Sequence, residues 1–122
     1  MYVVHEPGCS TIIESGYKVM IFCDAERLNP VNDSVDIEVV FDSGERYIAT
    51  FFTLANIHAL MTTYTEEGSE GNGHYFWASD MVIVRQLTYD YISDTIRAML
   101  AESDYEFQQV FTRVENDEEQ DE

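Results

Sequence analysis

The sequence predicts a single α+β domain, on three observations: its length, the order of its strand and helix patterns, and the short connections between them. At 122 residues the chain has room for one hydrophobic core. Its 45% hydrophobic and 13% aromatic content excludes a chain that is disordered throughout. Strand patterns precede and separate two helix patterns, an order typical of α+β folds. We therefore expect a small antiparallel or mixed sheet of about 4–6 strands, with two main helices packed on one face of it.

The strongest local pattern is a hairpin in the first half of the chain. Residues 17–23 are rich in aromatic and β-branched side chains and predict a first strand. Residues 35–39 then alternate at period two, and residues 47–52 return after the turn residues 42–44. A two-residue loop and a three-residue bulged loop would place opposite faces of the returning strand against the core. The sequence leaves the register open between these two.

The hydrophobic period changes to that of a helix at Thr53. We predict a helix that begins after Thr53, whose hydroxyl is a suitable N-cap, and that ends near Thr65. The connection from strand to helix is very short, so this helix is expected to fold straight back over the sheet. Its apolar stripe comprises Leu54, Ile57, His58, Met61 and Tyr64.

A second helix is predicted after Thr88, again with a very short connection from the strand before it. Leu87 and Ile92 occupy the two positions of a hydrophobic staple around Thr88, and Asp90 lies in the first helical turn. This helix is also expected to fold back onto the sheet. Its buried stripe should comprise Ile92, Ile96, Met99 and Leu100.

The remaining segments leave more alternatives open. Residues 66–73 form an acidic loop with three glycines. Residues 75–84 predict either one strand with a bulge or two strands joined by a tight turn, and residues 105–114 a short helix, a strand, or one after the other. Residues 115–122 hold six acidic residues and no apolar one. We therefore expect one globular domain over residues 1–114, followed by a disordered acidic tail.

The N-terminus and the cysteines indicate a reducing compartment. The first residues have neither the basic nor the apolar region of a secretory signal, so we expect a cytoplasmic protein. Cys23 lies in an apolar run and is expected to be a buried strand thiol. Cys9 follows the turn residues Pro7 and Gly8. Both thiols are expected to stay reduced, although the sequence alone leaves a disulfide between them open.

Charge is the most unusual property of the sequence, with 24 acidic residues against 6 basic ones and a net charge of −18. Without the six acidic residues of the tail, 18 acidic residues remain and the net charge is still −12, so most of the charge belongs to the predicted domain. Phosphate contacts need Lys and Arg, and Lys18 is the only lysine. We therefore expect no direct binding to nucleic acid or to a membrane.

No residue pattern indicates an enzyme. The histidines and cysteines do not occur at metal-binding spacing, and the acidic loop lacks the alternating ligands of an EF-hand. A nucleophile motif of the type Gly-x-Ser-x-Gly and a glycine-rich phosphate loop are both missing from the sequence. We therefore expect a protein that is not an enzyme, with no cofactor and no metal site. A small enzyme with no recognisable motif is one alternative.

The acidity predicts a basic partner. Complementary charge raises association rates, so the chain is expected to bind and inhibit a basic protein such as a toxin or a nucleic-acid-binding protein. Two versions share this mechanism, an immunity-type inhibitor with an acidic patch around an apolar anchor, and a mimic of nucleic acid. The other alternative is that the acidity serves only solubility or adaptation to high salt. The sequence leaves open whether the chain is a monomer or a dimer. The residues expected to contact a partner are Asp36, Glu38, Trp77, Tyr89, Asp90 and Asp94.

Overall fold

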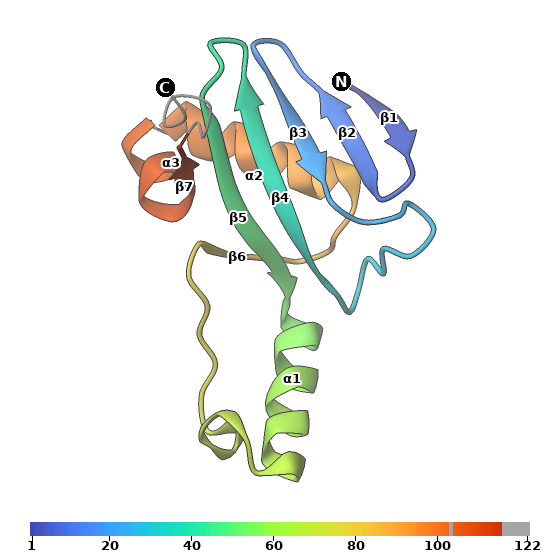
Figure 1. Ribbon diagram of the computed structural model, residues 1–122, viewed down its shortest axis with the longest axis vertical. Helices are drawn as coiled ribbons and strands as arrows, with labels where there is room; N and C mark the ends of the chain where they lie inside the picture. The colour runs from blue at the N-terminus through green and yellow to red at the C-terminus, as the bar shows by residue number, and fades with distance from the viewer. Residues whose placement is uncertain (103, 116–122) are drawn as a thin grey trace, which may run out of the picture.

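The computed structural model describes residues 1–102 and 104–115, which form one mixed sheet with helices on one side of it (Figure 1). Within those residues the sheet has seven strands in the order β1-β2-β3-β4-β5-β6, and β7 pairs with the free part of the β5 edge. All pairs are antiparallel except β5 with β6. The predicted α+β class is confirmed. The strands are β1 Tyr2–Glu6, β2 Cys9–Ile13, β3 Tyr17–Ile21, β4 Ser34–Phe41, β5 Arg46–Thr53, β6 Met81–Val84 and β7 Thr112–Val114, and the helices are α1 Leu54–Glu67, the short 3-10 helix η1 Glu70–Gly73, α2 Tyr89–Glu102 and α3 Asp104–Val110.

The first two strands have no counterpart among the predicted elements. They form a hairpin around Pro7 and Gly8, where Gly8 has a φ of 78° that suits glycine. His5 pairs with Ser10 in this hairpin, on the same face of the sheet as the core residue Ile12. Polar residues therefore occupy positions that face the core, and this conceals the alternation that would have indicated strands.

The register of the β4–β5 hairpin is that of the three-residue bulged loop. The backbone N–H of Phe41 donates to the carbonyl of Glu45 at 2.9 Å, and the N–H of Gly44 donates to the carbonyl of Phe41 at 2.8 Å. Gly44 has a φ of 101°, a conformation that side-chain-bearing residues rarely adopt. This loop places Tyr47 and Phe51 on the core face and leaves Ile48 on the other face.

The core lies between the sheet and the α2–α3 pair. Thr88 caps α2 as predicted, because its hydroxyl accepts the N–H of Tyr91 at 3.2 Å. The staple residues Leu87 and Ile92 are fully buried. Residues 105–114 form a helix and then a strand, which was one of the three alternatives. The buried apolar residues are Ile12, Val19, Ile21, Val35, Ile37, Val39, Tyr47, Ala49, Phe51, Val84, Leu87, Ile92, Ile96, Phe107 and Phe111.

The prediction that the helix after Thr53 folds back over the sheet is wrong. Thr53 does cap α1, since its hydroxyl accepts the N–H of Asn56 at 3.2 Å, but the helix then runs away from the sheet (Figure 1). No residue of α1 is buried. Of the helices within residues 1–102 and 104–115, only α2 and α3 therefore lie across a face of the sheet.

The helix α1 packs on its own returning chain instead of on the sheet. Gly68 ends the helix in a left-handed conformation with a φ of 68°. Gly73 then packs so closely on α1 that any side chain at this position would collide with the Met61 backbone and with Thr65. Residues 75–80 are not a strand, in contrast to the prediction, and only Met81–Val84 pairs with β5. We call residues 54–80 the arm.

Cys23 does not lie in a strand, because β3 ends two residues earlier at Ile21. Its thiol is only half-buried, and the prediction of a buried strand thiol is wrong. Partial burial, followed by the negative charges of Asp33 and Asp24, raises the pKa of this thiol. Cys9 opens β2, and both cysteines are free.

Over residues 1–102 and 104–115, no helix is long and apolar enough to cross a membrane. The predicted disordered tail lies almost entirely outside the described residues, of which Glu115 is the last.

A pair of truncations tests whether the core excludes the arm. Phe107 is 2% exposed and stacks on Phe111 with 4.3 Å between ring centroids. We expect Phe107→Ala to lower the free energy of unfolding by about 3–5 kcal/mol, because it removes a buried ring and leaves a cavity. Leu54, at the start of the arm, is 68% exposed, and Leu54→Ala should change stability by less than about 0.5 kcal/mol. Urea denaturation measures both, and an equal loss in the two variants would contradict this description of the core.

Candidate functional site

In the described part of the chain, no helix crosses the face of the sheet opposite α2 and α3 (Figure 1). Val4, Thr11, Met20, Glu38 and Ile48 lie side by side across five strands in one row of this face. Phe76 of the arm covers one corner, where the centroid of its ring lies 5.3 Å from that of Phe52. This face leaves several large apolar side chains exposed to solvent. Its apolar residues with at least two-fifths of their surface exposed are Tyr2, Val4, Phe22, Ile48 and Ile83.

Asp36 and Glu38 lie on this face, as their spacing predicts, but their surroundings differ. Glu38 is only 8% exposed and forms an ion pair with Arg46 on the neighbouring strand. Asp36 is exposed and accepts a hydrogen bond from the Thr50 hydroxyl at 2.9 Å. Asp36 is therefore available to a partner, whereas Glu38 is held in an ion pair within the sheet.

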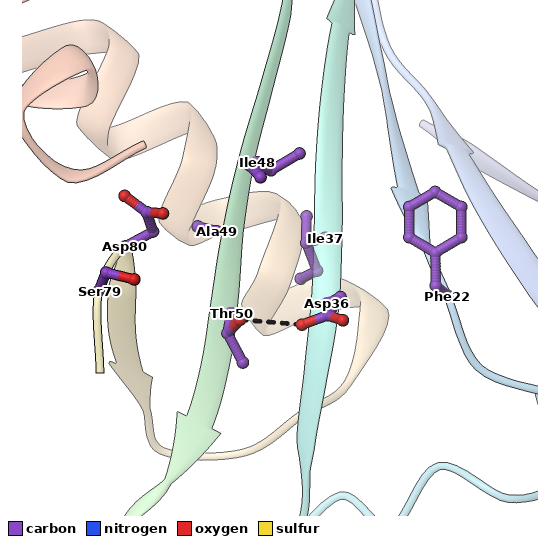
Figure 2. A pocket seen from close by; sticks show the side chains of 8 residues that line it. All are labelled: Phe22, Asp36, Ile37, Ile48, Ala49, Thr50, Ser79 and Asp80. Carbon is purple, nitrogen blue, oxygen red and sulfur yellow. Dashed lines mark hydrogen bonds between the residues drawn. The ribbon is translucent and has the colours of Figure 1, made fainter. Parts of the chain in front are cut away.

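A groove of about 320 Å³ crosses this face (Figure 2). Phe22 borders it on one side and Ser79 and Asp80 on the other, while Asp36 and Thr50 lie between them. The groove includes no Lys or Arg among its lining residues. The full lining consists of Phe22, Asp36, Ile37, Ile48, Ala49, Thr50, Ser79 and Asp80.

Asp80 is fixed at the groove by its backbone as well as by its side chain. Its φ is 54°, in the left-handed region that aspartate tolerates better than most residues. Its carbonyl accepts the N–H of Thr50 at 2.8 Å, and its carboxylate accepts a hydrogen bond from the Thr112 hydroxyl. No local pattern in the sequence points to Asp80, because its partners Thr50 and Thr112 are 30 and 32 residues away.

The arm is acidic and presents aromatic rings to solvent. The sequence has no Lys or Arg between Arg46 and Arg85, so the arm contains acidic residues without any basic neighbour within it. The exposed acidic residues at its end are Glu66, Glu67 and Glu70. Trp77 is 74% exposed and Tyr75 is 58% exposed on the returning segment. The predicted anchor Trp77 is thus at the surface.

The three predicted residues on α2 lie on the opposite side of the molecule. The Tyr89 hydroxyl lies 3.2 Å from the Ser10 hydroxyl, and the centroid of its ring lies 5.5 Å from that of the His5 ring. Tyr89 is therefore half-buried against the sheet. Asp94 accepts from Arg97 at 2.9 Å, and Asp90 is exposed in the first helical turn. The six predicted residues therefore occupy three separate places and do not form one surface.

Two polar clusters join the sheet to α2. The Ser93 hydroxyl, on a residue only 1% exposed, donates to the Glu14 carboxylate, which also accepts from Arg97 at 3.2 Å. His5 lies 2.8 Å from the hydroxyl of Ser10, which is also 1% exposed. The Ser10 hydroxyl thus lies between His5 and Tyr89, and this contact joins the first hairpin to α2. Across the described part of the chain, no three His, Cys, Asp or Glu side chains are grouped so that they could hold a metal ion.

Comparison with protein-family models, with curated proteins and with solved structures finds no match to this chain.

The two acidic residues of β4 provide a direct test of their different surroundings. Glu38→Gln should lower the free energy of unfolding by about 1–2 kcal/mol, because Arg46 loses a largely buried counter-charge. The expected loss is modest because 40% of the Arg46 side chain is exposed to solvent, which weakens the ion pair. Asp36→Asn should change it by less than about 0.5 kcal/mol. Thermal and urea denaturation measure both variants. Equal effects would show that Glu38 and Asp36 are equally accessible.

Proposed function

We propose that this chain is a non-enzymatic acidic binding protein that inhibits or neutralises a basic protein. The observation that supports this best is the arm. It is a helix without any buried residue, it has exposed acidic residues at its end, and it has no lysine or arginine. Its surface therefore complements a basic one.

The arm also has the side chains that provide binding energy at interfaces. Tryptophan and tyrosine are enriched among the residues that dominate binding, because they remove a large area from water with few rotatable bonds. Trp77 and Tyr75 are both more than half exposed, so this area is still available for burial. Acidic residues nearby raise the association rate, and the aromatic rings slow dissociation.

The shape of the arm suggests how it inhibits. A helix of 14 residues is about 21 Å long and about 10–12 Å wide with its side chains. A cleft that binds nucleic acid is lined with Lys and Arg to receive phosphates. An acidic projection built on such a helix can enter this cleft and exclude the nucleic acid from it. Both versions of the hypothesis, the immunity-type inhibitor and the mimic of nucleic acid, use this mechanism.

A charge-matched pair of variants tests the proposal. The arm variant combines Glu66→Gln, Glu67→Gln and Glu70→Gln, and the control combines Glu26→Gln, Asp42→Asn and Glu102→Gln, which are exposed acidic residues outside the arm. At low salt, the wild-type chain should capture a basic protein from a lysate of its source organism. With that protein purified, the arm variant and Trp77→Ala should each weaken binding by about tenfold or more, and the control by less than about twofold.

Salt dependence completes this test. The association rate should fall as the ionic strength rises, because the charges steer the encounter over distances comparable to the Debye length. Capture of no basic protein, or equal weakening by the arm variant and its control, would contradict the proposal. The acidity would then serve only solubility or tolerance of high salt.

A further inference from the structure

We infer that the groove on the uncovered sheet face binds the guanidinium group of an arginine of the basic partner. This inference rests on the proposed function, and it names the side chain that the partner inserts. The groove has a carboxylate at Asp36 and another at Asp80, an aromatic ring at Phe22 and an apolar side chain at Ile48 (Figure 2). No lining residue is basic, so the groove contains no cation of its own.

Both carboxylates are oriented before a ligand arrives. The Thr50 hydroxyl donates to one oxygen of Asp36 at 2.9 Å, and the Thr112 hydroxyl donates to one oxygen of Asp80. A carboxylate has about four acceptor positions, so each retains capacity for the N–H groups of a ligand. Groups that are already oriented lose less entropy when the ligand binds.

The lining favours arginine over lysine. A guanidinium group is flat, has five N–H donors and stacks on aromatic rings, whereas an ammonium group is compact and strongly hydrated. Phe22 is 44% exposed at the border of the groove and offers a ring face for such a contact. Ile48 can cover the methylene groups of the arginine stem. The volume of about 320 Å³ is at the lower end for ligand pockets, which suits a single side chain.

The groove is continuous with the arm, because Ser79 and Asp80 are the last residues of the arm and also line the groove. Trp77 precedes Ser79 by two residues. One basic partner can therefore contact the arm and insert an arginine into the groove at the base of the arm. Charge complementarity over the joined surface identifies the occupant as a basic protein.

Titration of the full chain with N-acetyl-arginine methylamide, followed by NMR, tests this inference. The backbone amide signals of Phe22, Ile48, Thr50 and Asp80 should shift with millimolar affinity. The lysine analogue should bind more weakly, and the citrulline analogue, which has nearly the same shape without the charge, should not bind. The double variant Asp36→Asn, Asp80→Asn should weaken arginine binding by about tenfold. Asparagine tolerates the positive φ at position 80, so the fold should be retained.

Two further variants complete the design. Asp42→Asn removes an exposed charge at the tip of the β4–β5 hairpin, and should change arginine binding by less than about twofold. Phe22→Leu should weaken binding of the arginine analogue by about threefold or more and leave that of the lysine analogue nearly unchanged. Unshifted groove signals, equal effects of the double variant and Asp42→Asn, or equal binding of citrulline would overturn the inference.

The outcome is distinguishable from that of the arm experiment. If the arm variant loses the basic partner while the arginine analogue leaves the groove signals unchanged, the proposed function stands and the groove inference fails. If the analogue binds in the groove but no basic protein is captured, the guanidinium site stands and the proposed function fails.

Discussion

The register of the β4–β5 hairpin determines which side chains face the helices, and the rest of the structure depends on it. The bulged loop closed by Phe41 and Glu45, with Gly44 at positive φ, places Tyr47, Ala49 and Phe51 toward the core. Tyr47 then packs on Phe107 of α3 with 5.2 Å between ring centroids. The same register leaves Asp36 and Thr50 paired on the uncovered face. A shift of one residue would bury these polar side chains and expose Phe51.

The helices α1 and α2 differ in how many apolar side chains they bury, and this difference determines which of them stabilises the sheet. The Ile92 and Ile96 side chains of α2 are fully buried, so this helix stabilises the sheet. The main packing partner of α1 is the segment that follows it, and α1 has no buried residue. An element that contributes little to the core is free to contact a partner. The exposed acidic residues and aromatic rings of the arm are consistent with this use.

Much of the fold could be predicted from local patterns, and the failures have physical causes. Thr88 and its hydrophobic staple, the alternation of β4, and the turn at Gly44 are local signals and were correct. The direction of α1 depends on whether the helix packs on the sheet or on its own returning chain. Close packing of Gly73 on α1 favours the second arrangement. The strand β2 was missed because polar Ser10 faces the core. Of the candidate surface, Asp36 and Trp77 were predicted, whereas Phe22 and Asp80 join the groove through contacts distant in sequence.

The most direct test of the central claim uses the fluorescence of Trp77, which is the only tryptophan of the chain. In the free protein this indole is 74% exposed, so acrylamide should quench its emission efficiently. The basic protein recovered by arm-dependent capture should be used to form the complex, with its own emission subtracted. If the arm enters the partner, quenching of Trp77 should fall several-fold and the emission should shift to shorter wavelength. A complex in which Trp77 is quenched as efficiently as in the free chain would contradict the account.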